Sequence, residues 1–506
     1  MKKWILILTI SFFSSYGFCQ NKEFNITTFG AKGDGVTLNT LYIQSAIDAA
    51  SAKGGGKIII PEGIFLTGRL ILKSGVNLYL KKNAVLLGST NPSYYESIGG
   101  REALITADGQ NNISITGKGT IDGQGRKLAL KIDSLFYAGK LDSKYYNFRR
   151  KRPEKRPKIL EIDNCKNILI SGITLKNSAS WVQNYTLCNN LIIDSIRVES
   201  DAYWNNDGID ITDCKNVRIT NSFVNSADDG ICLKSSNKGY YNDSIYIANC
   251  TVRSSASAVK FGTASVGGFR NVIIKNIKVY DTFRSAIAIE SVDGGFLENV
   301  EVDGINAVNT GNPVFIRLGH RNTDGPVGSL KNIVIKNIKV EVPFGPPDLN
   351  YEIRGPELPF FHNPFPSSIT GIPGYYPENI TLENIEISYP GRGNEGYAIL
   401  PLYRLKDVPE VENQYPEFSM FGELPAWGFY VRHVKGLIMK NINIKAREKD
   451  YRPAFVFDDV NGLNMGKIII EENVKVKKQI IFNNVRHTKL DIDKNMVHII
   501  NSEPSN

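Results

Sequence analysis

Histidine is scarce in this chain of 506 residues: there are five, and none precedes His320. A zinc site built from histidine and cysteine is therefore not expected in the first 319 residues. Cysteine is scarce as well, and the five cysteines that follow Cys19 are an odd number, which argues against a disulfide framework. The only uninterrupted apolar run lies at the N-terminus, which excludes a polytopic membrane protein.

That N-terminal run has the pattern of a secretory signal. Lys2 and Lys3 precede an apolar stretch over residues 4–13, and Gly17 and Cys19 are small residues at the positions that a signal peptidase reads. We therefore expect residues 1–19 to be a signal peptide and the protein to be exported, either to the periplasm or to the cell exterior. Lipidation of Cys19 is an alternative, although residues 16–18 form a poor lipobox.

The chain is basic, with 60 lysine and arginine residues against 51 aspartate and glutamate residues. Removal of Lys2 and Lys3 with the signal leaves 58 against 51, a charge of +7. Such a charge on an exported protein favours an acidic partner: an anionic polysaccharide, a nucleic acid or a membrane surface. Hydrophobic residues, at 42%, are frequent enough for a folded core, which excludes a disordered chain.

A short phrase recurs along the chain, an asparagine or serine followed by alternating β-forming residues. Its copies begin at Asn112, Asn167, Asn190, Asn216, Ser244, Asn271, Asn332 and Asn379. From position 167 to position 271 the copies are 23, 26, 28 and 27 residues apart. A repeat of this length predicts an all-β fold, a β-solenoid in which corresponding strands of successive coils stack about 4.8 Å apart.

Three cysteines keep a fixed place in this repeat. Cys165, Cys188 and Cys214 each lie two residues before the start of a phrase. We expect them to form a ladder of small buried side chains, with metal binding as the alternative.

The remaining segments predict a cap and several loops. Residues 39–53 have the pattern of an amphipathic helix, with Asn39 as its N-cap and glycines after it, and this helix is expected to cover the open end of the solenoid. The cap and first coils are expected over 20–110 and the β-helix over 111–506, with loop insertions at 124–158, 342–378 and 404–428. The first insertion is strongly basic between 149 and 158, and it is either the border of an anion-binding cleft or a solvated loop.

Three aspartates suggest the chemistry. Asp207 and Asp229 each precede a Gly-Ile pair, so the two segments can be aligned on adjacent coils, with Asp228 one residue back. Carboxylates this close raise one another's pKa, which lets a protonated acid and an ionised base coexist, as glycosidic bond cleavage requires. The alternatives are aspartates that cap turns and a calcium site.

These segments resemble glycoside hydrolase family 28, the polygalacturonase family. Asn205-Asn206-Asp207 matches the family's Asn-Thr-Asp motif, with Asn206 in place of threonine, and Asp228-Asp229 matches its Asp-Asp motif. The stretches 29–35 and 61–63 are also similar to family openings. The resemblance implies a right-handed parallel β-helix and an inverting mechanism. It makes Asp228 the general acid, while Asp207 and Asp229 hold and deprotonate the attacking water.

Two motifs of the resembled family are absent. Residues 256–258 read Ala-Ser-Ala where the family has Gly-His-Gly, and residues 288–290 read Ala-Ile-Glu where it has Arg-Ile-Lys. The second motif grips the carboxylate of a uronate in the family. The chain must therefore hold an anionic substrate in another way.

The predicted ladder offers replacement cations. Alternation points the middle residue of each strand outward, and the predicted outward column is Asp210, Cys232, Lys260, Ala288 and Arg317. Lys260 and Arg317 would then flank Ala288, one coil to either side. With their neighbours they give the candidate substrate-binding residues: Trp204, Asn205, Lys234, Lys260, Glu290, Arg317 and His320. Trp181 and Trp427 either stack on sugars or pack in the core.

The sequence therefore predicts an exported, inverting hydrolase of a pectic polysaccharide, monomeric, without cofactor, metal or nucleic acid. One alternative is a β-helix polysaccharide lyase with Lys260 or Arg317 as base and the aspartates binding calcium. Others are a hydrolase of another anionic glycan, such as a sulfated one, and a glycan-binding β-helix without catalysis.

Overall fold

The computed structural model of the protein describes residues 22–95, 102–148, 152–395, 402–471 and 478–501. The expected signal peptide over 1–19 lies outside the described residues. No helix in the described part of the chain is both long and apolar enough to span a bilayer.

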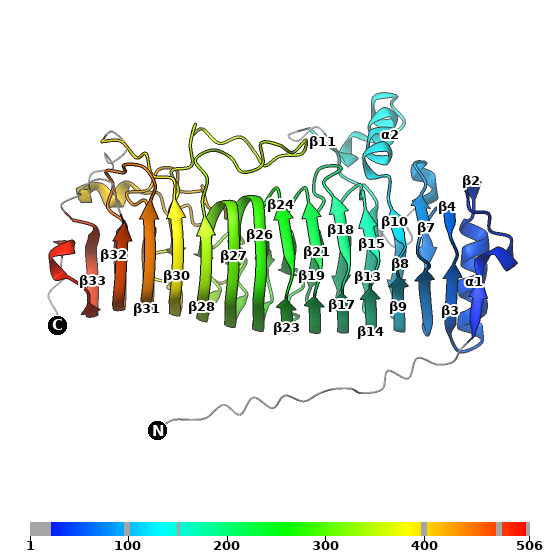
Figure 1. Ribbon diagram of the computed structural model, residues 1–506, viewed down its shortest axis with the longest axis horizontal. Coiled ribbons are helices and arrows are strands. Elements are labelled where there is room, and N and C mark those ends of the chain that lie inside the picture. The colour runs from blue at the N-terminus through cyan, green and yellow to red at the C-terminus, as the bar shows by residue number, and fades with distance from the viewer. Residues whose placement is uncertain (1–21, 96–101, 149–151, 396–401, 472–477, 502–506) are drawn as a thin grey trace, which may run out of the picture.

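Parallel strands wind into a single long coil (Figure 1). The pairing between strands of successive turns gives three strands to each complete turn. Strands of successive turns pair in register and form three ladders. The first ladder begins with β1 (Glu23–Asn25), β3 (Gly56–Ile60), β6 (Val76–Leu80), β9 (Asn111–Gly117), β14 (Lys166–Ser171), β17 (Asn189–Asp194), β20 (Lys215–Thr220) and β23 (Asn242–Ala248). The second begins with β2 (Asp34–Leu38), β4 (Gly63–Thr67), β7 (Ala84–Gly88), β10 (Thr120–Asp122), β15 (Thr174–Lys176), β18 (Arg197–Ser200), β21 (Phe223–Ser226) and β24 (Thr251–Ser254).

The third ladder forms the face that carries the candidate site. Its strands are β5 (Leu70–Ile71), β8 (Ala103–Asp108), β13 (Lys158–Asp163), β16 (Gln183–Thr186), β19 (Ile209–Thr212), β22 (Ile231–Ser235), β25 (Val259–Ser265), β29 (Ser367–Thr370) and β34 (Val497–Asn501). Further along, long strands bend through more than one ladder: β26 (Gly268–Ser291), β27 (Phe296–Leu318), β28 (Ser329–Glu341), β30 (Glu378–Tyr389), β31 (Phe429–Ala446), β32 (Phe455–Glu471) and β33 (Ile480–Asp491).

Alternating side chains explain the coil. In β14, Ile168 and Ile170 point inward, and they pair with Leu191 and Ile193 of β17 on the next turn. Branched apolar side chains fit this pleated, half-buried surface. One continuous hydrophobic core results, and it runs from Phe24 to Phe482. The predicted all-β solenoid is confirmed.

The recurring asparagines hold the corners of the coil. Asn112, Asn167 and Asn190 have left-handed backbone conformations, with φ between 56° and 58°. Asparagine tolerates this conformation better than most residues. The Asn167 amide donates to Asn112 Oδ1 (2.9 Å) and the Asn190 amide to Asn167 Oδ1 (3.0 Å), so one corner stacks on the next. Cys165, Cys188 and Cys214 are buried beside this corner, as expected of a cysteine ladder.

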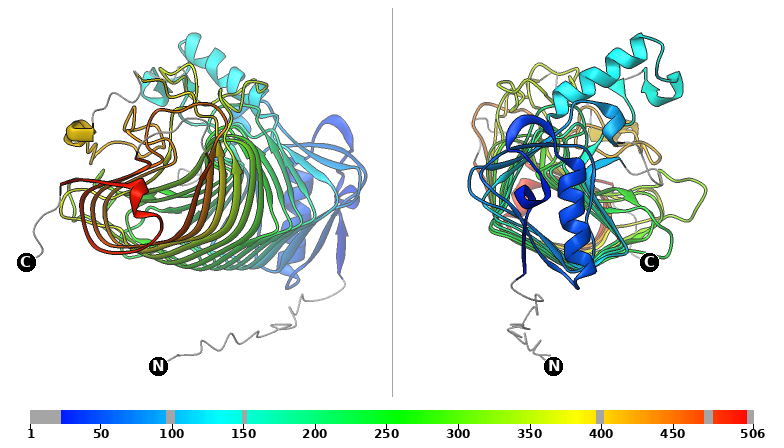
Figure 2. Two further views of the ribbon diagram at one scale, coloured as in Figure 1. Left: turned by 60° about the vertical axis from the view of Figure 1, so that its left-hand side comes forward. Right: turned by 90° about the vertical axis from the view of Figure 1, so that its right-hand side faces the viewer.

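A helix closes the N-terminal end of the coil, as predicted. α1 (Thr40–Ala52) lies across that end (Figure 2). Its residues Ile43, Ala46 and Ile47 are buried in the hydrophobic core. Asn39 precedes it, but its amide donates to the carbonyl oxygens of Lys32 and Thr37 and does not cap the helix.

Inserted segments gather along one edge of the coil (Figure 1). The first insertion contains a helix, α2 (Gly125–Tyr137), and a short antiparallel pair, β11 (Tyr146–Asn147) with β12 (Arg152–Pro153). The second differs from the prediction, because β29 lies within 342–378 and pairs with β27 and β31 as an ordinary strand of the coil. The single loop expected there is therefore two loops. The third insertion includes the 3-10 helix η5 (Leu402–Asp407).

Candidate active site

Two neighbouring turns bring three carboxylates together. Asp207 lies between β18 and β19, and Asp228 and Asp229 lie between β21 and β22. Ile209 pairs with Ile231, so Asp207 and Asp229 occupy equivalent places on adjacent coils, as the sequence predicts. One carboxylate oxygen from each of the three aspartates lies within 4.8 Å of the other two.

The glycine after Asp207 and the glycine after Asp229 allow the two turns to stack this closely. A Cβ atom at Gly208 would lie 2.5 Å from the carbonyl oxygen of Gly230 and 2.4 Å from Val224. At Gly230 it would lie 2.4 Å from Val252. The Asp-Gly pairs are therefore a packing requirement as well as a chemical signature.

The three aspartates differ in their access to solvent. Asp207 and Asp229 are 4% exposed, whereas Asp228 is only partly buried. The Asp228 carboxylate accepts hydrogen bonds from the side-chain amide of Asn205 (3.1 Å) and from the backbone N–H of Asp229 (3.0 Å). These contacts fix the carboxylate while leaving it accessible to a substrate.

Lys234 supplies positive charge beside Asp207 and Asp210. Its ammonium lies 2.8 Å from Asp207 Oδ2 and 2.6 Å from Asp210 Oδ1. Burial opposes the charged form of Lys234, but Asp207 and Asp210 outweigh it and hold its pKa well above the usual range. Burial also raises the pKa of Asp210, to about 6.

Burial opposes the charged form of Asp207. Burial raises the pKa of Asp207 well above its usual range against the opposing charge of Lys234, and the neighbouring aspartates add to the rise. Its second oxygen, Oδ1, is buried and has no hydrogen-bond partner among the described residues. An unpartnered buried oxygen is costly unless a ligand or water satisfies it.

Asp229 favours its ionised form. Burial alone would raise its pKa, but the charges of Lys260 and Arg284 reverse the effect and lower it. Lys260 Nζ lies 3.2 Å from the carboxylate, and the backbone N–H of Ser257 donates to it (3.1 Å). Environments that push the pKa values of two nearby acids apart are typical of acid–base sites.

Lys260 belongs to a buried polar cluster that the sequence did not predict. The Tyr415 hydroxyl lies 3.0 Å from Lys260 Nζ, and Glu290 is 1% exposed, with no hydrogen-bond partner for Oε2 among the described residues. Burial raises the pKa of Glu290 to about 8. Arg284 pairs with Glu417 of the third insertion at 3.3 Å. Tyr415 and Glu417 belong to the insertion expected over 404–428, but nothing in the sequence pattern places them beside Lys260.

The expected position of Arg317 is wrong. Asp210, Cys232, Lys260 and Ala288 do form one column, but Ala288 pairs with Phe315, and Arg317 pairs with Glu290. The Arg317 guanidinium is buried and donates to the carbonyl oxygens of Gly371 and Glu410, both at 2.7 Å.

A second hydrophobic cluster explains why Phe315, and not Arg317, follows Ala288 in this column. Beyond Lys260 the outward column becomes apolar, because Ala288 and Phe315 pack under the inserted loops against residues such as Phe365, Leu405 and Phe418. The loops therefore cover the face on the C-terminal side of the acids. Lys260, Glu290 and Arg317 contact the protein's own groups there, which corrects the expectation that they face an open cleft.

The other candidates are divided between the surface and the core. Trp204 is exposed next to Asn205, and the ring of His320 contacts the carbonyl oxygen of Gly325 (2.8 Å). Trp427 is buried against Tyr389 and packs in the core. Trp181 is partly exposed, and its ring lies 3.6 Å from Lys234 Nζ.

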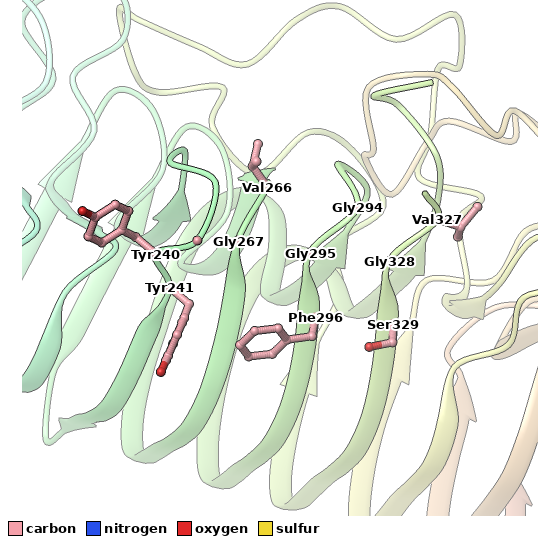
Figure 3. Close-up of a pocket in the computed structure, with 11 residues that line it drawn as sticks. Tyr240, Tyr241, Val266, Gly267, Gly294, Gly295, Phe296, Val327, Gly328 and Ser329 are labelled. Atoms are coloured by element: carbon pink, nitrogen blue, oxygen red, sulfur yellow. The ribbon is translucent and has the colours of Figure 1, made fainter. Parts of the chain in front are cut away.

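A separate hollow of about 420 Å³ lies near the starts of β26, β27 and β28. Figure 3 shows Tyr240, Tyr241 and Phe296 beside the backbone of successive glycines. None of its lining residues, all of them described, carries a carboxylate, so it is not a candidate for acid–base chemistry.

The fold and the three acids define a class, a glycoside hydrolase built on a parallel β-helix. The family model described as glycosyl hydrolases family 28 matches residues 51–342, more than half of the sequence, and the chain belongs to this family.

Individual relatives agree with this assignment. The chain is 28% identical over 342 residues to a probable polygalacturonase of Vitis vinifera, covering 64% of this chain and 62% of the relative. It is 28% identical over 324 residues to an exo-poly-alpha-D-galacturonosidase of Dickeya chrysanthemi, covering 54% and 53%. The chain therefore spans less than two thirds of the length of either relative.

A solved structure supports the fold. The family 28 exopolygalacturonase of Yersinia enterocolitica superposes with a TM-score of 0.61 at 20% identity, covering 94% of this chain and 79% of that one. The predicted right-handed parallel β-helix is confirmed.

Proposed function

We propose that the protein hydrolyses glycosidic bonds between uronate sugars in a pectic polysaccharide. The observation that carries this proposal is the set of Asp207, Asp228 and Asp229, whose nearest oxygens lie within 4.8 Å on adjacent coils. The names of the Vitis and Dickeya relatives, a probable polygalacturonase and an exo-poly-alpha-D-galacturonosidase, support the substrate class. The basic charge of the chain and the signal pattern over 1–19 support an exported enzyme with an anionic substrate.

In the proposed mechanism Asp228 donates a proton to the glycosidic oxygen as the bond to the anomeric carbon breaks. Its partial exposure supports this role, because a general acid must reach the substrate. Asp229, held ionised by Lys260, accepts a proton from the attacking water. The unpartnered Oδ1 of Asp207 is suited to bind the same water.

Inversion is the proposed outcome, with retention as the second candidate. Inverting enzymes usually separate their two carboxyl groups by about 6.5–9.5 Å, and retaining enzymes by about 5–5.5 Å. The nearest oxygens of the three carboxylates lie within 4.8 Å of one another, which makes retention the second candidate. NMR of the first product anomers from polygalacturonate decides the question: an inverted anomer supports the proposal, and a retained anomer makes one aspartate a nucleophile.

A calcium-dependent lyase is a further candidate, because three clustered carboxylates are suited to bind calcium. Lys234 and Lys260, bonded to Asp207 and Asp229, already supply positive charge at the cluster and favour hydrolysis. We therefore expect full activity in excess chelator and products without a new double bond. Ultraviolet absorbance of an unsaturated uronate, lost with chelator, would establish the lyase instead.

A further inference from the structure

The cations closest to the acids are already engaged with the protein. Lys234 pairs with Asp207 and Asp210, Lys260 with Asp229, and Arg317 with backbone carbonyl oxygens. All three side chains are largely buried. A substrate that carries a carboxylate on each sugar therefore needs other cations to bind it.

A pocket on the N-terminal side of the acids is lined by four further cations; Arg152 and Lys158 pair with Glu154 and Glu161, and Lys155 has the most exposed side chain of the three. This basic pocket has a volume of about 400 Å³, and its lining includes Arg152, Lys155, Arg156, Lys158, Trp181 and Asn205. Two acids, Glu102 and Glu154, also line it, so cations outnumber acids there by four to two. Burial raises the pKa of Glu102 against the opposing charges of Lys155 and Lys158.

Asn205 connects the basic pocket directly to the proposed general acid. Its side-chain amide donates to Asp228 Oδ2 (3.1 Å), and its own oxygen accepts from the guanidinium of Arg156 (3.2 Å). The same guanidinium donates to the carbonyl oxygen of Trp204 (2.9 Å). Arg156 therefore holds Asn205, which both lines the pocket and donates to Asp228. A sugar bound in the pocket would lie next to Asp228.

Trp181 adds an apolar surface to these charges. Its ring lies 5.0 Å from Lys158 Nζ and 3.6 Å from Lys234 Nζ. A sugar ring stacks on an aromatic face through its C–H groups, and a carboxylate on that sugar pairs with a neighbouring cation. Lys155 is the most accessible of the paired cations, with its side chain 52% exposed and 3.9 Å from Glu102.

We infer that the basic pocket is a substrate subsite that binds the carboxylate of a uronate sugar unit in the coils before Asp228. This inference rests on the proposed function. The inferred anion-binding position lies on the N-terminal side of the three aspartates. It does not lie at Ala288, where the inserted loops cover the face. Residues 152–158 of the first insertion are then part of the binding surface and not merely a solvated loop.

The test compares Lys155→Gln with Lys435→Gln. Lys435 is a matched control because it is 58% exposed and pairs with Glu378 at 3.3 Å on a different part of the coil. Lys155→Gln is expected to lower kcat/KM on polygalacturonate about tenfold, because one hydrogen bond to a charged group is lost. The change should come mainly from a higher KM. Activity on a fully methyl-esterified oligomer should change less than twofold, and Lys435→Gln should change neither.

A binding arm separates this inference from the proposed function. Titration calorimetry of trigalacturonate into Asp228→Asn protein, with and without Lys155→Gln, measures the pocket without turnover. Weaker binding with Lys155→Gln supports the subsite even if the wild type hydrolyses no pectic substrate, which would overturn only the proposed function. Unchanged binding, or equal losses on charged and esterified substrates, would overturn the subsite.

Discussion

Lys260 Nζ lies 3.2 Å from the carboxylate of Asp229, although the two residues belong to adjacent coils and both side chains are buried. Without its partner on the adjacent coil, neither the Lys260 ammonium nor the Asp229 carboxylate would stay charged in the interior, because an isolated buried ion is strongly destabilising. Stacking of the coils therefore sets the protonation state of the site. The pKa of Asp229 is lowered, whereas the pKa of Asp207, one coil away, is raised.

Replacement of Lys260 by methionine should therefore shift the acid limb of the pH–rate profile upward. Asp229 loses the nearest charge that lowers its pKa, so the base becomes protonated at a higher pH and activity is lost earlier on acidification. The free energy of unfolding should also fall, by about 3–5 kcal/mol, because a buried ion pair loses one partner. The profile of kcat/KM against pH is the measurement.

A double variant, Lys260→Met with Glu290→Gln, separates positioning from structure. Burial already favours the neutral form of Glu290, so the second substitution should change the free energy of unfolding little. The shifted acid limb should remain, because Asp229 still lacks its cation. Return of the wild-type pH profile in the double variant would show that Lys260 acts on stability alone.

Asp228→Asn should lower kcat by about 10²–10⁴-fold, the usual worth of general acid catalysis. The two hydrogen bonds reach different oxygens, Oδ2 from Asn205 and Oδ1 from the Asp229 N–H, so the single amide oxygen keeps one of them and the free energy of unfolding should fall by about 1 kcal/mol. Asp194→Asn, at a partly buried aspartate on the first ladder, is the control for the substitution itself. Near-normal turnover by Asp228→Asn would remove Asp228 from the mechanism.

The sequence predicts the acids well and their surroundings poorly, for a physical reason. Asp207 and Asp229 are placed correctly because the Gly-Ile pairs that follow them must pack in register. Arg317 is misplaced because the loops bury the outward face there, so Phe315 occupies a position where alternation predicts a polar residue. Local sequence patterns predict the strands of the coil. The residues that cover its outer face come from loops distant in the sequence, which those patterns do not place.

Arg317→Ala should consequently act on stability and not on substrate charge. The side chain donates to Gly371 and Glu410 carbonyl oxygens, and its loss leaves buried acceptors without a donor. The free energy of unfolding should fall by about 2–3 kcal/mol, since hydrogen bonds to charged groups contribute about 1.5–3 kcal/mol each. Any loss of kcat/KM should be equal on free and methyl-esterified oligomers, and a loss confined to the free acid would restore Arg317 as a substrate ligand.

Glu290→Gln should change how stability depends on pH. Burial raises the pKa of Glu290 to about 8, whereas in the unfolded chain it titrates near 4.5. The folded state therefore binds the proton more tightly, and this contribution to stability is complete below about pH 4.5 and is lost as the pH rises through about 8. Glutamine stays neutral at every pH, so the variant should lose less stability than the wild type between pH 5 and pH 8. Parallel melting temperatures of the two proteins across that interval, measured by calorimetry, would show that Glu290 is ionised in the folded protein and paired with Lys260.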